Sequence, residues 1–390
     1  MADASHGARR PCIYLDHGAT SWPKPPEVVD AVVDALREHG ANPGRGAYEM
    51  ALAAARIVFD ARRACADLLK VPDSRDVAFT SGCTEATNVM LKGLLQPGDR
   101  VVVSSMEHNA VSRPLTALAR EGVELVVVSA DATGAVDVSD MERAVRLAPT
   151  RAVVCQHASN VTGTVQPIGE LSRVAHDNGA LLLVDGAQGG GHLDVDLTAL
   201  DVDAYALSGH KGMLGPQGVG LLYLRPGLEA RELMQGGTGG GRSEGDEQPA
   251  SRPERYEAGT PNTPGIAGLG AAARLLLEHG AAWRAEEQRR YRVLVEGLRR
   301  IADLTVFGPA ADTPAVPIVS VVSATMDPDR IASLLDRAHC VAVRAGLHCA
   351  PWAHRTIGTL GTGAVRFGVG YGNTDEDVEA ALAALSEVLS

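Results

Sequence analysis

The chain has 390 residues and a net charge of −12, and 45% of its residues are hydrophobic. A chain of this length can bury a sizeable core in one or more domains. The acidic excess argues against a nucleic-acid partner or an anionic membrane surface, because phosphate binding requires clustered lysine and arginine. Small molecules and other proteins remain as expected partners.

The N-terminal sequence MADASHGARRP contains two arginines, but no apolar segment follows them, so it lacks the pattern of a secretory signal. No stretch has the apolar length of a membrane span. The six cysteines are scattered without CxxC pairs, which indicates neither a zinc site nor a disulfide framework. We therefore expect a cytoplasmic, reduced protein without a metal centre.

Strand and helix patterns alternate from about residue 50 to residue 225, which is typical of βα units in a mostly parallel sheet. Residues 51–70 and 83–95 have the apolar spacing of helices. Short apolar runs that end in polar or glycine-rich turns predict strands within 99–108, 124–131, 151–159, 180–187 and 218–224. Ligands in such sheets bind at the carboxyl ends of the strands.

A glycine-rich segment, GGTGGGRSEG at 236–245, precedes a long polar stretch and predicts a functional loop. No GxGxxG sequence lies between a strand and a helix, so a dinucleotide-binding loop is not indicated. From residue 262 onward, helical and strand-like segments predict a smaller α+β domain. We therefore expect a large domain over 20–261 and a small domain formed by 262–390 together with the N-terminal segment 1–19.

Lys211 lies in Ser208-Gly209-His210-Lys211-Gly212, directly after a predicted strand. A lysine is by itself most often a solvated surface charge. Asp185, however, ends the apolar run LLLVD earlier in the chain and predicts a buried carboxylate without an obvious structural partner. Pyridoxal phosphate needs such a pair, a lysine for covalent attachment and a carboxylate for its pyridine nitrogen.

A phosphate group also needs hydrogen-bond donors. Gly82-Cys83-Thr84 begin the predicted helix 83–95, where free backbone amides can bind phosphate. Ser208 and His210 can supply further donors. An ordinary strand-to-helix turn would show the same local pattern, so the prediction depends on all of these residues together.

Taken together, these residues resemble the class V aminotransferase-like enzymes of pyridoxal-phosphate fold type I, and in detail the cysteine desulfurase and selenocysteine lyase family. The resemblance extends from Tyr14 to Thr374. Its most specific motifs are SGCTEATN (81–88), MEHN (106–109), SNVTGT (159–164), VDGAQ (184–188), SGHKGMLGPQGVG (208–220), EAGTPNTPG (257–265) and RAGLHCAP (344–351). It implies an α/β fold, with helices flanking a mostly parallel central sheet in the large domain and a smaller α+β C-terminal domain.

The resemblance implies a role for each cofactor residue. Lys211 would bind pyridoxal phosphate covalently, and Asp185 would pair with the pyridine nitrogen. His108 would stack on the ring and move protons, while Gln188 would meet the ring hydroxyl. The phosphate would be held by Thr84, Ser208 and His210, and by Thr260 from the neighbouring subunit of a homodimer, and Cys83 would also lie in the cofactor site.

Cys349 lies in Gly346-Leu347-His348-Cys349-Ala350-Pro351. Arg344 and His348 precede it closely, and positive neighbours favour the reactive thiolate. The residues alone leave Cys83 as an alternative, because it begins a predicted helix. The resemblance implies that Cys349 accepts sulfur from L-cysteine, with L-selenocysteine as an alternative substrate of the same site.

An amino-acid substrate also needs a carboxylate partner, for which a bidentate arginine is suited. Arg366, in the predicted strand AVRFGVG, matches the family's carboxylate arginine, and Asn160 matches a residue beside the cofactor ring. Arg344 is a second candidate contact, with a structural salt bridge as its alternative. The implied reaction converts L-cysteine to L-alanine and leaves a persulfide on Cys349 for a sulfur-acceptor protein.

Three positions depart from the family pattern. His17 stands where asparagine is usual and can approach the mouth of the site, Leu347 replaces the first of two histidines, and Asn109 replaces a second histidine. The alternatives are selenocysteine lyase activity and another class V reaction, such as transamination, epimerisation or carbon–sulfur cleavage. A cofactor-retaining scaffold that only relays sulfur is a further alternative. Cys349 argues against the other class V reactions, and the complete set of cofactor residues argues against a scaffold.

Overall fold

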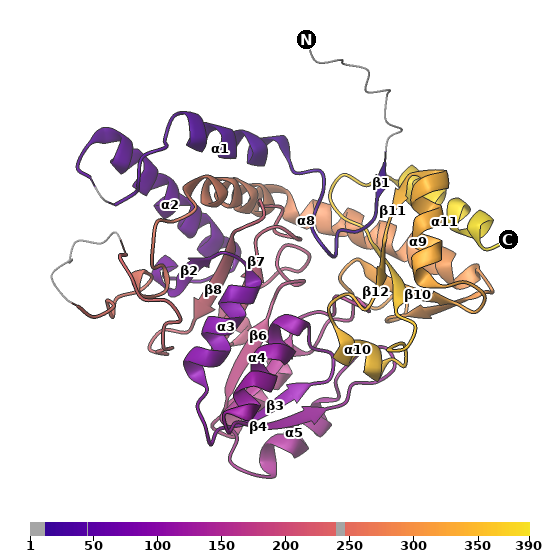
Figure 1. Ribbon diagram of the computed structural model, residues 1–390, viewed down its shortest axis with the longest axis horizontal. Helices are drawn as coiled ribbons and strands as arrows, with labels where there is room; N and C mark the ends of the chain where they lie inside the picture. The colour runs from indigo at the N-terminus through magenta and orange to yellow at the C-terminus, as the bar shows by residue number, and fades with distance from the viewer. Residues whose placement is uncertain (1–11, 45, 239–245) are drawn as a thin grey trace.

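The computed structural model describes residues 12–44, 46–238 and 246–390. Most of the predicted functional loop, residues 239–245, lies outside the described residues. The chain forms a large sheet and a small sheet that lie side by side, with helices around both (Figure 1).

The large sheet has seven strands in the order β2-β8-β7-β6-β5-β3-β4. In chain order these are β2 (Val77–Thr80), β3 (Arg100–Ser104), β4 (Glu124–Val128), β5 (Ala152–Gln156), β6 (Leu181–Asp185), β7 (Ala204–Ser208) and β8 (Gly220–Leu224). Strands β4, β3, β5, β6 and β7 are mutually parallel, whereas β8 is antiparallel to both of its neighbours. The predicted α/β fold with a mostly parallel sheet is confirmed.

Helices cover both faces of this sheet, because successive side chains of a strand point to opposite faces. Leu182 and Val184 of β6 belong to the core under one set of helices, and Leu183 belongs to the core under the other. The first set comprises α2 (Glu49–Leu68), α5 (Val138–Arg146), α6 (Ile168–Asp177) and the short α7 (Leu197–Leu200). The second comprises α3 (Cys83–Leu94) and α4 (Asn109–Arg120). Burial on both faces accounts for the nearly continuous apolar runs of the strands.

The small sheet is antiparallel, with the strand order β12-β13-β10-β9. Its strands are β9 (Leu304–Phe307), β10 (Ile318–Ser323), β12 (Arg344–Gly346) and β13 (Ala364–Gly368). The helices that follow these strands are α9 (Pro328–His339), α10 (Pro351–Thr356) and α11 (Asp375–Val388). The N-terminal segment joins this part of the molecule, because β1 (Ile13–Tyr14) pairs in parallel with β11 (Val341–Ala342).

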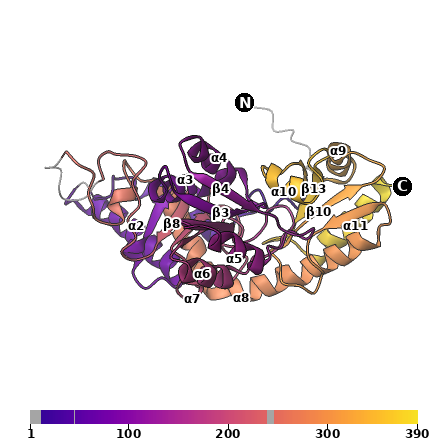
Figure 2. The same ribbon diagram turned by 90° about the horizontal axis from the view of Figure 1, so that it is seen from below.

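Helix α8 (Thr263–Arg300) runs from the large sheet to the small sheet, as Figure 2 shows. Leu269 in its first half packs in the core of the large sheet, and Leu294 in its second half packs in the core of the small one. Helix α1 (Pro26–Arg37) packs against α8, and two short 3-10 turns, Ser74–Asp76 and Glu254–Tyr256, complete the fold. Within the described residues, no helix has the length and hydropathy needed to cross a membrane.

Candidate active site

A cavity of about 400 Å³ lies where the carboxyl ends of the large-sheet strands face the small sheet. Ten of the thirteen predicted site residues line it: Cys83, Thr84, His108, Asn160, Asp185, Ser208, His210, Lys211, Arg344 and Arg366. The first eight follow or end strands of the large sheet, whereas the two arginines lie on β12 and β13. The topology thus brings residues from both sheets together around one cavity.

Lys211 and Asp185 follow adjacent parallel strands, because Asp185 ends β6 and Lys211 comes just after β7. Asp185 Oδ1 accepts hydrogen bonds from the amide of Ala187 (2.9 Å) and from the thiol of Cys83 (3.4 Å). Burial lowers the pKa of Lys211, although the nearby Asp185 carboxylate opposes this shift. A lowered lysine pKa favours the neutral amine, which is the nucleophilic form.

His108 is the N-cap of α4, and its Nδ1 accepts a hydrogen bond from the amide of Ala110 (3.0 Å). Burial, followed by the charge of Lys211, lowers the pKa of His108 to about 4. The imidazole is therefore neutral at pH 7. Since Nδ1 accepts, we infer that the ring proton is on Nε2, from which His108 can donate into the cavity.

Arg366 is 1% exposed and is held by two contacts at the back of the cavity. Its Nη2 donates to Asp16 Oδ1 (2.6 Å) and its Nη1 donates to the carbonyl of Asn160 (3.0 Å). Gly18 lets the N-terminal segment pass directly over the guanidinium, because an added Cβ would lie 2.9 Å from Arg366 Cζ. The sequence analysis assigned no role to Asp16, and no local signal links residues so far apart in the chain.

The N-terminus of α3 and His210 also line the cavity. The first amides of a helix have no intrahelical acceptor, and an added Cβ at Gly82 would meet only open space. The carbonyl of His210 accepts hydrogen bonds from the Ser21 amide (2.9 Å) and from Lys24 Nζ (2.9 Å). Ser21 and Lys24 thus position the backbone next to Lys211, a role that the sequence did not reveal. Burial lowers the pKa of His210 to about 4.

Three predicted residues do not line the cavity. Gln188 is buried beside it, with Nε2 donating to the carbonyl of Gly18 (2.9 Å). Thr260 is exposed and lines a neighbouring cavity of about 220 Å³. Cys349 is exposed, and its Sγ lies 3.4 Å from Nη2 of Arg344, which does line the main cavity. Arg344 therefore links the thiol to the cavity.

The three departures from the family pattern have distinct environments. His17 is 2% exposed and packs against Tyr14, with 5.1 Å between ring centroids, so the expectation that it approaches the mouth of the site is wrong. Leu347 is partly exposed next to Cys349. Asn109 donates its backbone amide to the carbonyl of Cys349 (2.8 Å), so this position supports the cysteine through its main chain.

The cavity is suited to a polar ligand. Among the described residues, four buried polar atoms of predicted site residues have no hydrogen-bond partner: Asn160 Oδ1, Gln188 Oε1, His210 Nδ1 and Arg366 Nε. Buried polar groups are nearly always paired, so each unpaired atom requires an explanation. A ligand with a phosphate and a ring hydroxyl, together with a substrate that has a carboxylate, would provide hydrogen-bond partners for these atoms. Pyridoxal phosphate with an amino acid fits this set of donors and acceptors.

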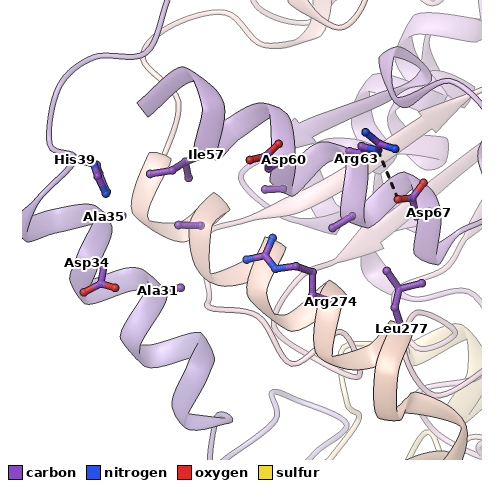
Figure 3. A pocket seen from close by; sticks show the side chains of 13 residues that line it. Ala31, Asp34, Ala35, His39, Ile57, Asp60, Arg63, Asp67, Arg274 and Leu277 are labelled. Carbon is purple, nitrogen blue, oxygen red and sulfur yellow. Dashed lines mark ion pairs between the residues drawn. The ribbon is translucent and has the colours of Figure 1, made fainter. Parts of the chain in front are cut away.

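A second cavity, of about 590 Å³, lies between α1, α2 and α8 (Figure 3). Its polar lining includes the carboxylates of Asp34, Asp60 and Asp67, and Arg63 lies 3.9 Å from Asp67. It contains none of the predicted site residues. Although this cavity has the larger volume, the first cavity is therefore the candidate active site.

Comparison with known proteins identifies the family of this chain. Residues 13–381 match the family model described as Aminotransferase class-V. A protein of Methanothermobacter thermautotrophicus named probable cysteine desulfurase is 36% identical over 390 residues, covering 96% of this chain and 94% of the relative. A cysteine desulfurase of Escherichia coli O157:H7 is 34% identical over 353 residues, covering 87% of this chain and 84% of the relative.

Solved structures give the same result. The apo structure of a cysteine desulfurase from Thermococcus onnurineus NA1 has a TM-score of 0.86 and 31% identity, covering 97% of this chain and 94% of that one. The E. coli cysteine desulfurase CsdA also has a TM-score of 0.86, with 30% identity over 97% of this chain and 94% of that chain. The resemblance predicted from the sequence motifs is confirmed, and the chain belongs to the aminotransferase class-V family.

Proposed function

We propose that this protein is a pyridoxal-phosphate-dependent cysteine desulfurase, which converts L-cysteine to L-alanine and transfers the sulfur to Cys349. One observation carries the proposal: the exposed thiol of Cys349 contacts Arg344, which lines the cavity that contains Lys211 and Asp185. A cofactor lysine and its carboxylate serve many reactions, but only sulfur transfer needs a thiol at this place.

In this account Lys211 would hold the cofactor covalently and Asp185 would pair with its pyridine nitrogen. Gln188 would meet the ring hydroxyl, the phosphate would be held by Thr84, Ser208 and His210, and Cys83 would lie beside Asp185 in the cofactor site. When bound, pyridoxal phosphate supplies an electron-withdrawing ring that stabilises negative charge at the substrate α-carbon.

The protein residues then move protons and orient the substrate. Lys211 Nζ takes the proton from the substrate α-carbon, and His108 donates and accepts a proton at Nε2. Arg366 binds the substrate carboxylate, supported by its unpaired Nε and its fixed position against Asp16. Asn160 contacts the substrate beside the ring, and Arg344 is a second contact for the carboxylate.

Cys349 receives the sulfur. Its Sγ forms a bond to the substrate sulfur as the bond from that sulfur to the substrate β-carbon breaks, which leaves a persulfide on the enzyme. The thiol is exposed, so an acceptor protein can reach the persulfide without opening the cavity.

We also propose a homodimer in which Thr260 completes the phosphate site of the partner subunit. Its support is that Thr260 is exposed and lies outside the main cavity of its own chain. Large apolar side chains are exposed on α2, including Leu52 (59%) and Phe59 (58%). Exposed apolar groups of this size mark interaction surfaces. We propose that, among the described residues, 20–261 form the large domain and 12–19 with 262–390 form the small domain, the first half of α8 packing against the large sheet.

The direct test is to incubate the holoenzyme separately with L-cysteine, L-selenocysteine and L-alanine, and to measure alanine, sulfide, selenide and pyruvate. The proposal predicts alanine and reducible sulfur in equal amounts from L-cysteine. Pyruvate from L-cysteine would indicate carbon–sulfur cleavage instead. Turnover of L-selenocysteine alone would indicate a selenocysteine lyase.

A further inference from the structure

The segment that carries Cys349 has a backbone conformation that side chains disfavour. His348 has a φ of 50° and Cys349 a φ of 56°, although neither is glycine. Two consecutive residues in the left-handed region cost about 1 kcal/mol each. This conformation therefore persists only where neighbouring groups hold it.

Two contacts hold the main chain of this pair. Asn160 Nδ2 donates to the carbonyl of His348 (2.8 Å), and the amide of Asn109 donates to the carbonyl of Cys349 (2.8 Å). Both donors come from the large sheet, from the turn after β5 and from the start of α4. The large sheet thus fixes the backbone of the pair from one side.

A chain of side chains holds the pair from the other side. His348 Nε2 lies 3.2 Å from the carbonyl oxygen of Arg344, and His348 Nδ1 lies 3.2 Å from His354 Nε2. His354 Nδ1 in turn lies 2.7 Å from Thr359 Oγ1. The three contacts connect α10 and the loop after it to β12.

The partners determine the direction of every hydrogen bond in this chain. A carbonyl oxygen can only accept, so His348 Nε2 must carry a proton and Nδ1 of a neutral His348 must accept. His354 Nε2 must then donate, which leaves its Nδ1 to accept from the hydroxyl of Thr359. All four groups are thereby satisfied with both rings neutral.

The burial of His348 and His354 is consistent with neutral imidazole rings. His348 is 2% exposed and His354 is fully buried. Burial, followed by the charge of Arg366, lowers the pKa of His348 to about 2 and that of His354 to about 4. The chain of hydrogen bonds is therefore the same throughout the neutral pH range.

We propose that His354 is a positioning residue for Cys349: through His348 it fixes the Arg344 main chain and the left-handed pair, and so keeps Sγ of Cys349 against the Arg344 guanidinium. The inference rests on the proposed function, in which this sulfur accepts the sulfur of the substrate. The Arg344 guanidinium, 3.4 Å from Sγ, thus fixes the place from which the sulfur reacts. His354 itself touches neither the substrate nor the cofactor.

The test compares His354→Leu, which keeps most of the volume but removes both polar atoms, with His354→Gln, which keeps one donor and one acceptor. Thr359→Val removes only the last donor of the chain and serves as a milder variant if His354→Leu does not fold. His279→Leu on the exposed surface of α8 is the matched control. The measurements are the alkylation rate of Cys349 by iodoacetamide, followed by peptide mass spectrometry, the cofactor absorbance, and kcat and KM for L-cysteine.

We expect His354→Leu to slow alkylation of Cys349 and to lower kcat for L-cysteine by about five- to tenfold, with KM and cofactor absorbance unchanged. Thr359→Val should show a smaller loss of the same kind. His354→Gln should restore both rates to within about twofold of the wild type, since it can replace the hydrogen bonds.

Unchanged alkylation and kcat in folded His354→Leu and Thr359→Val would overturn the inference. So would equal losses in His354→Leu and His354→Gln accompanied by loss of cofactor, because that result would show only a packing role. The alkylation assay needs no turnover. If the wild type made no alanine yet His354→Leu still slowed alkylation, the proposed function would fail while the positioning role would stand.

Discussion

The two regions that carry the proposed chemistry are built in different ways. The Lys211 cavity is formed largely by residues at the ends of buried parallel strands, where Asp185 and Lys211 follow neighbouring strands. Cys349 instead lies in a short connection from the small sheet, with two non-glycine residues at positive φ. One region derives its geometry from the sheet, whereas the other requires a separate set of polar contacts.

This difference predicts that binding of the cofactor and transfer of the sulfur can be disrupted separately. Changes at the end of the sheet should remove both, because every step depends on the cofactor. Changes in the Cys349 segment should leave the cofactor in place. The following variants test this separation, from the largest expected effect to the smallest.

The largest effect is expected for Lys211→Ala. The variant should lose the covalent cofactor, and alanine formation should fall by roughly 10³- to 10⁴-fold, because the residue both attaches the cofactor and moves the α-proton. Reduction of the wild type with borohydride and peptide mapping should find the cofactor on Lys211. Lys92→Ala, on α3, is the control. Recovery of the reduced cofactor from a different lysine would contradict the assignment.

Cys349→Ser should separate the two regions. We expect the cofactor absorbance and its response to L-cysteine to persist, while alanine formation over many turnovers falls by about 10²-fold or more. Selenocysteine turnover should be less affected, because selenide leaves without needing a thiol acceptor. Cys12→Ser changes another exposed cysteine and should have no effect. Full cysteine turnover by Cys349→Ser would show that sulfur leaves by another route.

Arg366→Lys tests the link between the two sheets. Loss of the guanidinium geometry should raise KM for L-cysteine by about 10- to 100-fold through loss of a charge-assisted contact, with the cofactor retained. Asp16→Asn removes the negative charge that lies 2.6 Å from Arg366 Nη2, and it should raise KM by a smaller factor. The measurement is KM for L-cysteine from steady-state kinetics of both variants. An unchanged KM in Arg366→Lys would contradict a role of this arginine in substrate binding.

A separate prediction concerns the stability of the fold against acid. The pKa values of six buried or half-buried histidines are lowered, namely to about 3 for His17, about 4 for His108, His157, His210 and His354, and about 2 for His348. The unfolded chain binds protons below pH 6.5 while these folded rings do not, so stability should fall as the pH falls from 6.5 toward 4. Each histidine contributes about 1.4 kcal/mol per pH unit within its window.

The buried carboxyl group of Glu107 has the opposite effect on how stability changes with pH. Burial raises its pKa to about 8, so its contribution to stability is lost as the pH rises from 4.5 toward 8. One glutamate does not offset six histidines. Thermal unfolding of the apoenzyme from pH 7 to pH 4 should therefore show a falling Tm, and a Tm independent of pH in this range would contradict the buried neutral histidines.

The sequence predicted the residues of the Lys211 cavity more fully than the structure of the Cys349 segment. Apolar runs that end in polar residues predict both the strands and the edge at which Asp185 and Lys211 meet, because parallel strands align their carboxyl ends. The contact from Asp16 to Arg366 gave no such signal, since tertiary pairing between the chain ends is not encoded in local periodicity. The same holds for Thr359, His354 and His348, whose roles depend on the turn that brings them together.

His17 was misjudged for a related reason. A polar residue next to a predicted site suggests exposure to the ligand, but the bridge between Asp16 and Gly368 turns the ring of His17 into the core beside Gly370. Local sequence therefore indicated which residues can react. Which of them face the cavity depended on contacts between the two sheets.

The most direct test of the central claim is the fate of the substrate sulfur. Wild-type holoenzyme is incubated with L-cysteine without reductant, and its peptides are analysed by mass spectrometry for a cyanide-labile sulfur atom. The account predicts one added sulfur on the peptide that contains Leu347-His348-Cys349, formed in step with alanine. Alanine formed with the sulfur on another cysteine, or released without any protein persulfide, would contradict it.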